Sequence, residues 1–223
     1  ANFVARHLYN FFVADEVPVP QWDVTSPRDP EAIEELAKAY FAYDHNIGAM
    51  IKVLFNSSFF KESIGKKVKS PTELVFGTLR LSGEYNNQSK IDSGIYGALA
   101  EAGFMGQELS NPPSVEGWHT GEEWITSGAL VDRVNFVTSH IANKDNPGVK
   151  RLLDKVDVSS GNTPESLVEA CIDILGPIEM QNSTREELVS LAYSEISSSD
   201  TSSSTYETTD LILKIFKLIM INI

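Results

Sequence analysis

The residues best suited to chemistry lie in one proline- and glycine-rich stretch, NPPSVEGWHTGEEW, at residues 111–124. A histidine at position 119 is a candidate general base for hydrolysis. The indole of Trp118 offers a flat apolar face on which a sugar ring or a peptide can stack. Amide, carboxylate and guanidinium groups nearby can hydrogen-bond a polar ligand. The candidate binding residues are Asn111, Trp118, His119, Glu122 and Arg133.

Three interpretations of this stretch remain open. In the first, Trp118 and Trp124 are buried and fix the loop over the helix hairpin, with Arg133 and Asn135 bonded to loop carbonyls. In the second, the loop is a rigid recognition surface, because two prolines limit its backbone freedom in advance. In the third, His119 serves a hydrolytic site. Only the last interpretation requires an enzyme.

No catalytic constellation is recognisable elsewhere in the sequence. The four histidines are far apart and none has the i, i+4 spacing that brings two imidazoles to one metal. Adjacent carboxylates such as Glu122 and Glu123 point in different directions on a helix, and the positive end of a helix dipole accounts for acidic residues in first turns. Cys171 falls on an apolar helical face and is expected in the core. We therefore expect no metal and no cofactor.

The charge balance limits the class of partner. With 31 acidic and 18 basic residues, the formal net charge is -13. Nucleic acids and anionic membrane surfaces attract clustered Lys and Arg, so neither is an expected partner. The apolar run at residues 211–223 is shorter than the roughly 20 residues needed to span a bilayer, and it contains two lysines. We expect a buried terminal helix there and no transmembrane segment.

The elements that must position these residues are predicted to be helices. Apolar residues recur at three and four positions throughout and seldom alternate at two, which favours an all-α fold, an irregular multi-helix bundle with long ordered loops and no significant sheet. Asp29 with Pro30 is typical of a helix start, and so is the capping box Thr120-Gly121-Glu122-Glu123, which predicts a long helix carrying Trp124 near its beginning. A first helix is expected to have one apolar stripe that faces the core, formed by Val4, Leu8, Phe11 and Phe12.

The domain organisation is predicted from a change after Asn146-Pro147, where the helical segments become shorter and each has its own capping residue. Residues 1–146 are expected to form a main helical domain that carries the loop with its Asn-Pro-Pro and Gly-Trp sequences. Residues 147–223 are expected to form a C-terminal helical subdomain, with a flexible serine-rich loop at 197–205 because that segment has no apolar residue among its serines.

Four segments in order resemble one bacterial family, the domain of unknown function 1800. The opening ANFVARHLYNFFVADE is similar to the family pattern FIARKLYRFFVSDEPP. The run KSPTELVFGTLR at residues 69–80 is similar to KSPVELVVGLLR, and the segment YDHNI at 43–47, followed by LFNSSFF, also matches. The most specific similarity is MGQELSNPPSVEGWHTGEEWITSGALVDRVNF at residues 105–136. The tail after residue 142 resembles the family weakly.

The resemblance implies an exported bacterial protein, periplasmic or extracellular. It also implies that this chain is the C-terminal half of a longer protein, whose N-terminal half is then a partner of the chain. The family has no established activity to transfer. It commonly has proline at the position of His119, which disfavours this histidine as a required base.

These observations predict an uncharacterised helical domain of an exported bacterial protein. Its expected role is that of a binding or structural module with a protein or polysaccharide partner at the cell envelope. The alternative is a fragment of a hydrolase that acts on envelope or extracellular polymers, with its remaining site residues in an N-terminal half. An enzyme fragment should place the polar groups of the loop in a concave pocket or at an open face left by the missing half. A purely structural loop should bury both indoles.

Overall fold

The helical prediction is confirmed by the computed structural model of the chain. It describes residues 1–86, 88–115, 117–156, 163–176, 178, 180–198 and 205–221. Within these ranges every regular element is an α-helix or a 3-10 helix, and the β-type pairing is one isolated bridge between Ser114 and Gly117. The fold is therefore all-α without a sheet in the part of the chain that the structure describes.

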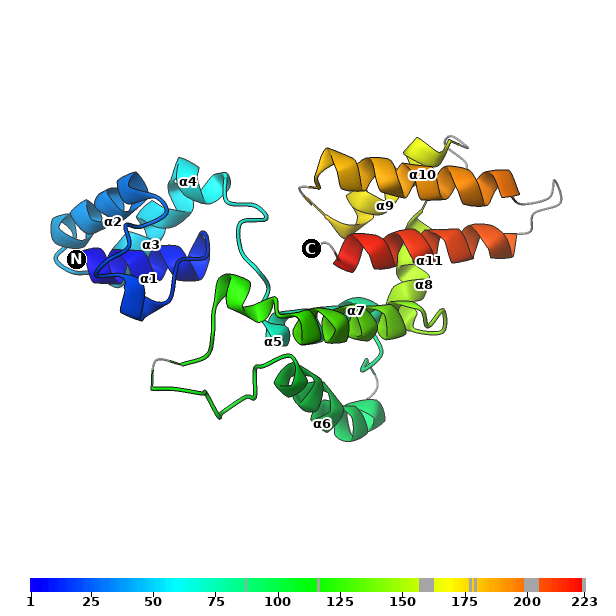
Figure 1. Cartoon of the computed structure of the whole chain (residues 1–223), viewed down its shortest axis with the longest axis horizontal. Coiled ribbons are helices and arrows are strands. Elements are labelled where there is room, and N and C mark those ends of the chain that lie inside the picture. The colour runs from blue at the N-terminus through cyan, green and yellow to red at the C-terminus, as the bar shows by residue number, and fades with distance from the viewer. Residues whose placement is uncertain are drawn as a thin grey trace. The chain divides into compact units, whose positions relative to one another are not determined.

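The chain forms two compact units, each containing residues from separate parts of the sequence. Unit 1 comprises Ala1–Ser70 and Asn111–Thr126, and unit 2 comprises Pro71–Ser110 and Ser127–Ile223. Unit 1 contains α1 (Asn2–Phe12), η1 (Val19–Gln21), α2 (Pro30–Ala42), α3 (Ile47–Asn56), α4 (Ser58–Lys61) and η2 (Gly121–Trp124) (Figure 1). Unit 2 contains α5 (Pro71–Ser82), α6 (Gln88–Phe104), α7 (Ser127–Ile141), α8 (Pro147–Lys155), α9 (Pro164–Leu175), α10 (Asn182–Ser198) and α11 (Thr205–Ile221).

Unit 1 is built on a helical hairpin that packs on α1. Helix α2 begins as predicted, because Oδ1 of Asp29 accepts a hydrogen bond from the Ala32 amide at 3.0 Å. Between α2 and α3 the chain reverses through Asp44 and His45, with φ of 48° and 64°, a left-handed conformation that these residue types tolerate better than most. The expected burial of Phe11 is wrong, since its side chain is 71% exposed.

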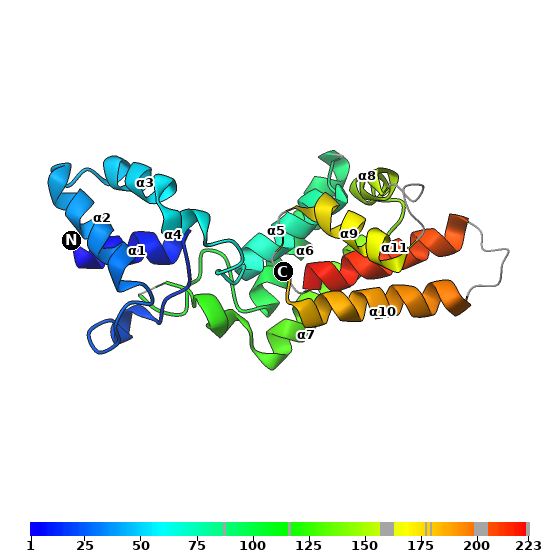
Figure 2. The same ribbon diagram turned by 90° about the horizontal axis from the view of Figure 1, so that it is seen from above.

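Unit 2 has one continuous apolar core to which all its helices from α5 to α11 contribute. Figure 2 shows α10 and α11 lying side by side, and both pack with α9. Cys171 is fully buried on α9, as expected for a core residue. The compact units thus divide the chain differently from the expected boundary between residues 146 and 147, which stays a prediction about independently folding domains.

The expected serine-rich loop falls mostly outside the described residues. Helix α10 extends to Ser198 and α11 begins at Thr205, so residues 197 and 198 are helical, and residues 199–204 lie outside the description. In α11 the apolar face predicted from the sequence is buried, including Phe216 and Ile219. Over the described residues, no helix has both the length and the apolar character that crossing a membrane requires.

Candidate functional site

The site is built on a buried ion pair that attaches an irregular connection to α1. Arg6 donates from Nε and Nη2 to Oε2 of Glu16, at 3.2 and 2.8 Å, and both side chains are almost fully buried. The other carboxylate oxygen, Oε1, accepts the Arg28 amide at 2.8 Å. Buried charges are tolerated when they are paired and hydrogen-bonded, as these are.

The same guanidinium fixes the middle of the connection at residues 17–27. It donates to the carbonyls of Trp22, Thr25 and Ser26 at 2.9 to 3.3 Å, and its carbon lies 4.7 Å from the centre of the Trp22 ring. The Trp22 indole donates in turn to the Val17 carbonyl at 2.7 Å. A segment with little regular structure is therefore rigid, because one arginine satisfies several of its carbonyls.

Asp15, at the start of the connection, joins two further segments of unit 1. Its Oδ1 accepts from Nζ of Lys67 at 3.2 Å and its Oδ2 accepts the Val68 amide at 2.7 Å. Gly121 approaches so closely that a β-carbon there would lie 2.9 Å from Cβ of Asp15. With φ of 61°, Gly121 also has a backbone conformation that favours glycine. The beginning of η2 at Gly121 therefore lies directly against the connection.

The predicted capping box begins a shorter element than expected. The Thr120 amide donates to Oε2 of Glu123 at 3.3 Å, the reciprocal contact of a capping box, but the element that follows is the single 3-10 turn η2. The long helix α7 begins only at Ser127. Trp124 therefore ends η2 and does not belong to α7, and its side chain is 4% exposed. The turn buries the indole and leaves the preceding glutamates at the surface.

These segments enclose a pocket of about 450 Å³ within unit 1. One wall is the connection after α1 and the other is the beginning of η2. The lining residues are Asp15, Glu16, Val17, Pro18, Gln21, Ser26, Arg28, Thr120, Glu122 and Glu123. Most of the lining residues are polar, and they offer carboxylate, amide, hydroxyl and guanidinium groups from both walls.

The carboxylates of this pocket differ in how far they are already engaged. Asp15 and Glu16 are paired with Lys67 and Arg6. Oε1 of Glu123 lies 3.3 Å from Nδ1 of His119. Within the described part of the chain the Glu122 side chain has no ion pair or hydrogen bond, so its carboxylate is available to a ligand.

The predicted site residues do not all come together. Glu122 lines the pocket, whereas Asn111 and His119 are exposed on the same loop and Trp118 is partly buried there. Arg133 lies in α7 of unit 2, where burial lowers the pKa of its guanidinium. These five positions stay predicted binding residues. Among the described residues, no group of three or more His, Cys, Asp or Glu side chains could hold a metal ion.

Sequence reasoning missed the residues that build the opposite wall. Arg6 and Glu16 lie in an apparently apolar helix and its following segment, and a pattern of apolar residues cannot identify a buried ion pair. The sequence signal that could have found them is the opening segment that resembles the family pattern, because it contains both Arg6 and Glu16. Arg28 was also missed, although it precedes the cap of α2 and lines the pocket.

Comparison with known families adds one decisive observation. The family described as "Protein of unknown function (DUF1800)" matches residues 1–221. The chain belongs to this family. The match to DUF1800 includes the tail after residue 142, where the resemblance by motif is weak. No curated protein and no solved structure matches the chain.

Several residues of the site lie in two of the segments that resemble DUF1800. The opening motif contains Arg6, Asp15 and Glu16, and the proline- and tryptophan-containing motif contains Gly121 and Trp124. In this chain the two motifs meet at Asp15 and Gly121. The two motif segments thus contribute part of the pocket lining, Asp15 and Glu16 from one and Thr120, Glu122 and Glu123 from the other, and the rest comes from residues 17–28.

Proposed function

We propose that this chain is a binding module of an exported bacterial protein, and that it recognises a polysaccharide at the cell envelope through the loop at residues 111–124. The observation that carries the proposal is the pocket beside η2, in which Glu122 faces a wall held by the Arg6 and Glu16 pair. A rigid site loses little entropy on binding, so even modest polar contacts contribute to affinity.

The chemistry of the pocket favours a neutral, hydroxyl-rich ligand. Gln21 and Ser26 can both donate and accept hydrogen bonds, Arg28 donates, and the carboxylate of Glu122 accepts from hydroxyl groups. Trp118 on the same loop is partly exposed and offers a surface for stacking on a sugar ring. The pocket also meets one expectation for a hydrolase fragment, because it contains loop carboxylates. Binding and hydrolysis must therefore be measured together.

The test is a titration of the chain with soluble glucans, xylans, chitin oligosaccharides and peptidoglycan fragments. Binding is followed by tryptophan fluorescence, and reducing ends are assayed in the same samples. We expect at least one polysaccharide to bind without release of reducing ends. Release of reducing ends that depends on Glu122 would support the hydrolase alternative.

Two variants test the assigned surface. Glu122→Gln and Trp118→Ala should each weaken polysaccharide binding about tenfold, as expected for a lost charged hydrogen bond or a lost stacking contact. Tyr96→Ala is the matched control, because Tyr96 is a highly exposed aromatic residue of α6 in unit 2. Absence of binding to every polysaccharide, or equal affinity of Trp118→Ala and wild type, would refute the proposal.

The proposal also predicts where in the cell the protein is located. A polysaccharide partner of the envelope requires a periplasmic or extracellular location, as the family resemblance also implies. Fractionation of cells that express the full-length protein should recover it outside the cytoplasm. Recovery with the cytoplasmic fraction alone would contradict both the location and the proposed ligand.

A further inference from the structure

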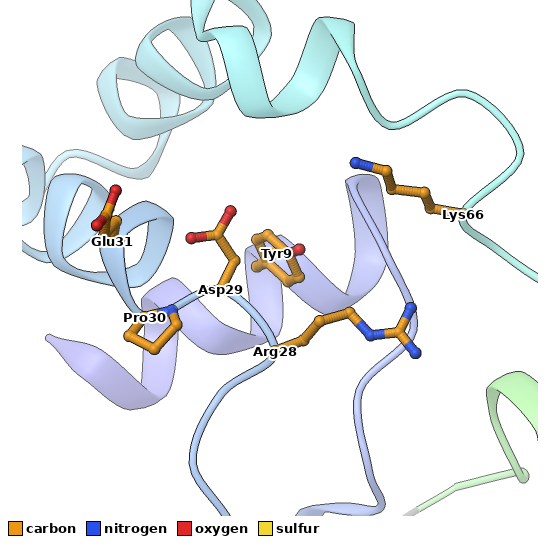
Figure 3. Close-up of a pocket in the computed structure, with 6 residues that line it drawn as sticks. All are labelled: Tyr9, Arg28, Asp29, Pro30, Glu31 and Lys66. Carbon is orange, nitrogen blue, oxygen red and sulfur yellow. The ribbon is translucent and has the colours of Figure 1, made fainter.

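A second hollow on unit 1 has a volume of about 670 Å³ and lies between α1, the beginning of α2 and the segment after α4 (Figure 3). The residues that line it are Tyr9, Arg28, Asp29, Pro30, Glu31 and Lys66. Except for Arg28, none of them lines the pocket beside η2. The hollow is therefore a separate place on the surface with its own chemistry.

Tyr9 provides the base of this hollow and has an unused polar group. Its side chain is 3% exposed, yet within the described residues its hydroxyl makes no hydrogen bond. Because Tyr9 lines the hollow and its hydroxyl oxygen is not among the buried unpartnered atoms of the described residues, this hydroxyl is open to a ligand in the hollow. In Figure 3 the phenolic oxygen lies on the side of the ring nearer to Lys66 and Arg28. Burial, and then the charges of Asp29 and Glu16, raise the pKa of Tyr9, which keeps the hydroxyl protonated as a donor.

Two cations border the hollow without a carboxylate partner. Neither Arg28 nor Lys66 forms an ion pair within the part of the chain that the structure describes, although the chain has 31 acidic and 18 basic residues. In a chain with this excess of carboxylates, two cations that share one hollow and remain available form a receptor for negative charge.

Two carboxylates border the other part of the hollow. In the view of Figure 3, Asp29 and Glu31 lie on one side of Tyr9, and the heads of Arg28 and Lys66 lie on the other. The beginning of α2 is not itself the receptor, because Asp29 already caps it through Ala32. A dianion would meet both carboxylates, and a simple cation would meet both basic groups. A ligand with one charge of each sign complements the whole hollow.

We propose that this hollow binds a small zwitterion that carries a carboxylate and an ammonium group. The carboxylate contacts Arg28, Lys66 and the hydroxyl of Tyr9. The ammonium group faces Asp29 and Glu31. This is the chemistry of a free amino acid or of a short peptide. Arg28 also lines the pocket beside η2, but Tyr9, Asp29, Glu31 and Lys66 line this hollow alone, so the proposal does not rest on polysaccharide binding.

The test is a titration of the chain, followed by NMR or calorimetry, with four probes. Glycylglycine carries both charges, N-acetylglycine only the carboxylate, glycinamide only the ammonium group, and inorganic phosphate is the competing anion. We expect glycylglycine to bind at least about tenfold more tightly than each of the other three, since each lacks a charged contact. Glycine and triglycine then distinguish a free amino acid from a peptide as the preferred source.

Variants decide whether the binding occurs in this hollow. Lys66→Gln should raise the Kd for glycylglycine about tenfold, and Tyr9→Phe, which removes only the hydroxyl, about fivefold. The matched control is Lys52→Gln, which removes the same charge from the exposed face of α3 and should leave the Kd unchanged. Circular dichroism confirms that each variant is folded.

Three results would overturn the proposal. They are absence of glycylglycine binding, binding of phosphate or N-acetylglycine as tight as that of glycylglycine, and equal weakening by Lys52→Gln and Lys66→Gln. Glu122→Gln separates the two sites, because it should reduce polysaccharide binding and leave glycylglycine binding unchanged. A failure at one site therefore does not imply a failure at the other.

Discussion

Oε2 of Glu16 accepts two hydrogen bonds from the Arg6 guanidinium, at 3.2 and 2.8 Å, in a place where both side chains are buried. Glu16→Ala should lower the free energy of unfolding of unit 1 by about 3 to 5 kcal/mol, because it leaves a buried guanidinium without its carboxylate. All three tryptophans, Trp22, Trp118 and Trp124, belong to unit 1, so urea unfolding followed by tryptophan fluorescence measures this unit.

The control for this prediction is Glu34→Ala. Glu34 forms an ion pair with Lys38 at 2.6 Å, but both side chains are exposed. Solvent-exposed ion pairs contribute little to stability, so the unfolding curve of this variant should overlap that of wild type. Similar losses in the two variants would show that the Arg6 and Glu16 pair has no special role.

Trp124 and Trp118 should respond differently to truncation. Trp124→Ala removes a buried indole and should lower the stability of unit 1 by about 3 to 5 kcal/mol, with a fall of several degrees in Tm. Trp118→Ala should have a clearly smaller effect, because this indole is only partly buried. Thermal melting of both variants checks the prediction. An unchanged Tm for Trp124→Ala would refute a structural role for η2.

Gly121 and Gly117 form a second matched pair. Both have positive φ, 61° and 100°, but a β-carbon at Gly117 would meet nothing within 4 Å, whereas one at Gly121 would lie 2.9 Å from Cβ of Asp15. Gly117→Ala should therefore destabilise unit 1 by about 1 to 2 kcal/mol through its backbone alone. Gly121→Ala should add about 1 to 3 kcal/mol for the steric overlap. Equal losses in urea unfolding would contradict the close approach.

Cys171 reports on unit 2. Burial raises the pKa of its thiol from 9.0 to about 12. We expect a thiol reagent such as 5,5′-dithiobis(2-nitrobenzoic acid) at pH 8 to label the folded chain only as fast as unit 2 unfolds, and to label the urea-unfolded chain at once. Rapid labelling under native conditions would contradict the buried position.

The same shift predicts how the stability of unit 2 depends on pH. Because the folded pKa is raised, the contribution of the protonated thiol is fully present below about pH 9 and is lost as the pH rises towards 12. At pH 10.5 the loss amounts to about 2 kcal/mol. Cys171→Ala should lack this part of the decline when urea unfolding is followed by circular dichroism. An identical decline in the variant would assign it to other groups.

Sequence periodicity predicted the helices and several of their ends, because these depend on local interactions. The cap of Asp29 on Ala32, and that of Thr163 on Ser166 at 3.2 Å, need only neighbours in sequence. Burial depends on what covers each face. Phe11 has the expected spacing but is exposed, while the polar Arg6 is buried beneath the connection.

The pockets could not be predicted for the same reason. Glu122 was identified as a candidate from its loop, but its opposite wall comes from residues about a hundred positions earlier. Tyr9, Arg28 and Lys66 likewise belong to three separate segments, and nothing in their local sequence shows that they line one hollow. Trp124 was placed at the beginning of a long helix because a capping box does not show how far the helix continues.

The meeting of Asp15 with Val68 and Gly121 also has a consequence for how the protein folds during synthesis. The first segment of unit 1 ends at Ser70 and its second segment begins at Asn111. Residues 71–110 must therefore be synthesised before the second segment can pack on the first. Closing a loop of that length opposes docking by about 3 kcal/mol of chain entropy. The helices α2 and α3 can form before residues 71–110 are made, whereas Trp124 reaches its buried position only after them.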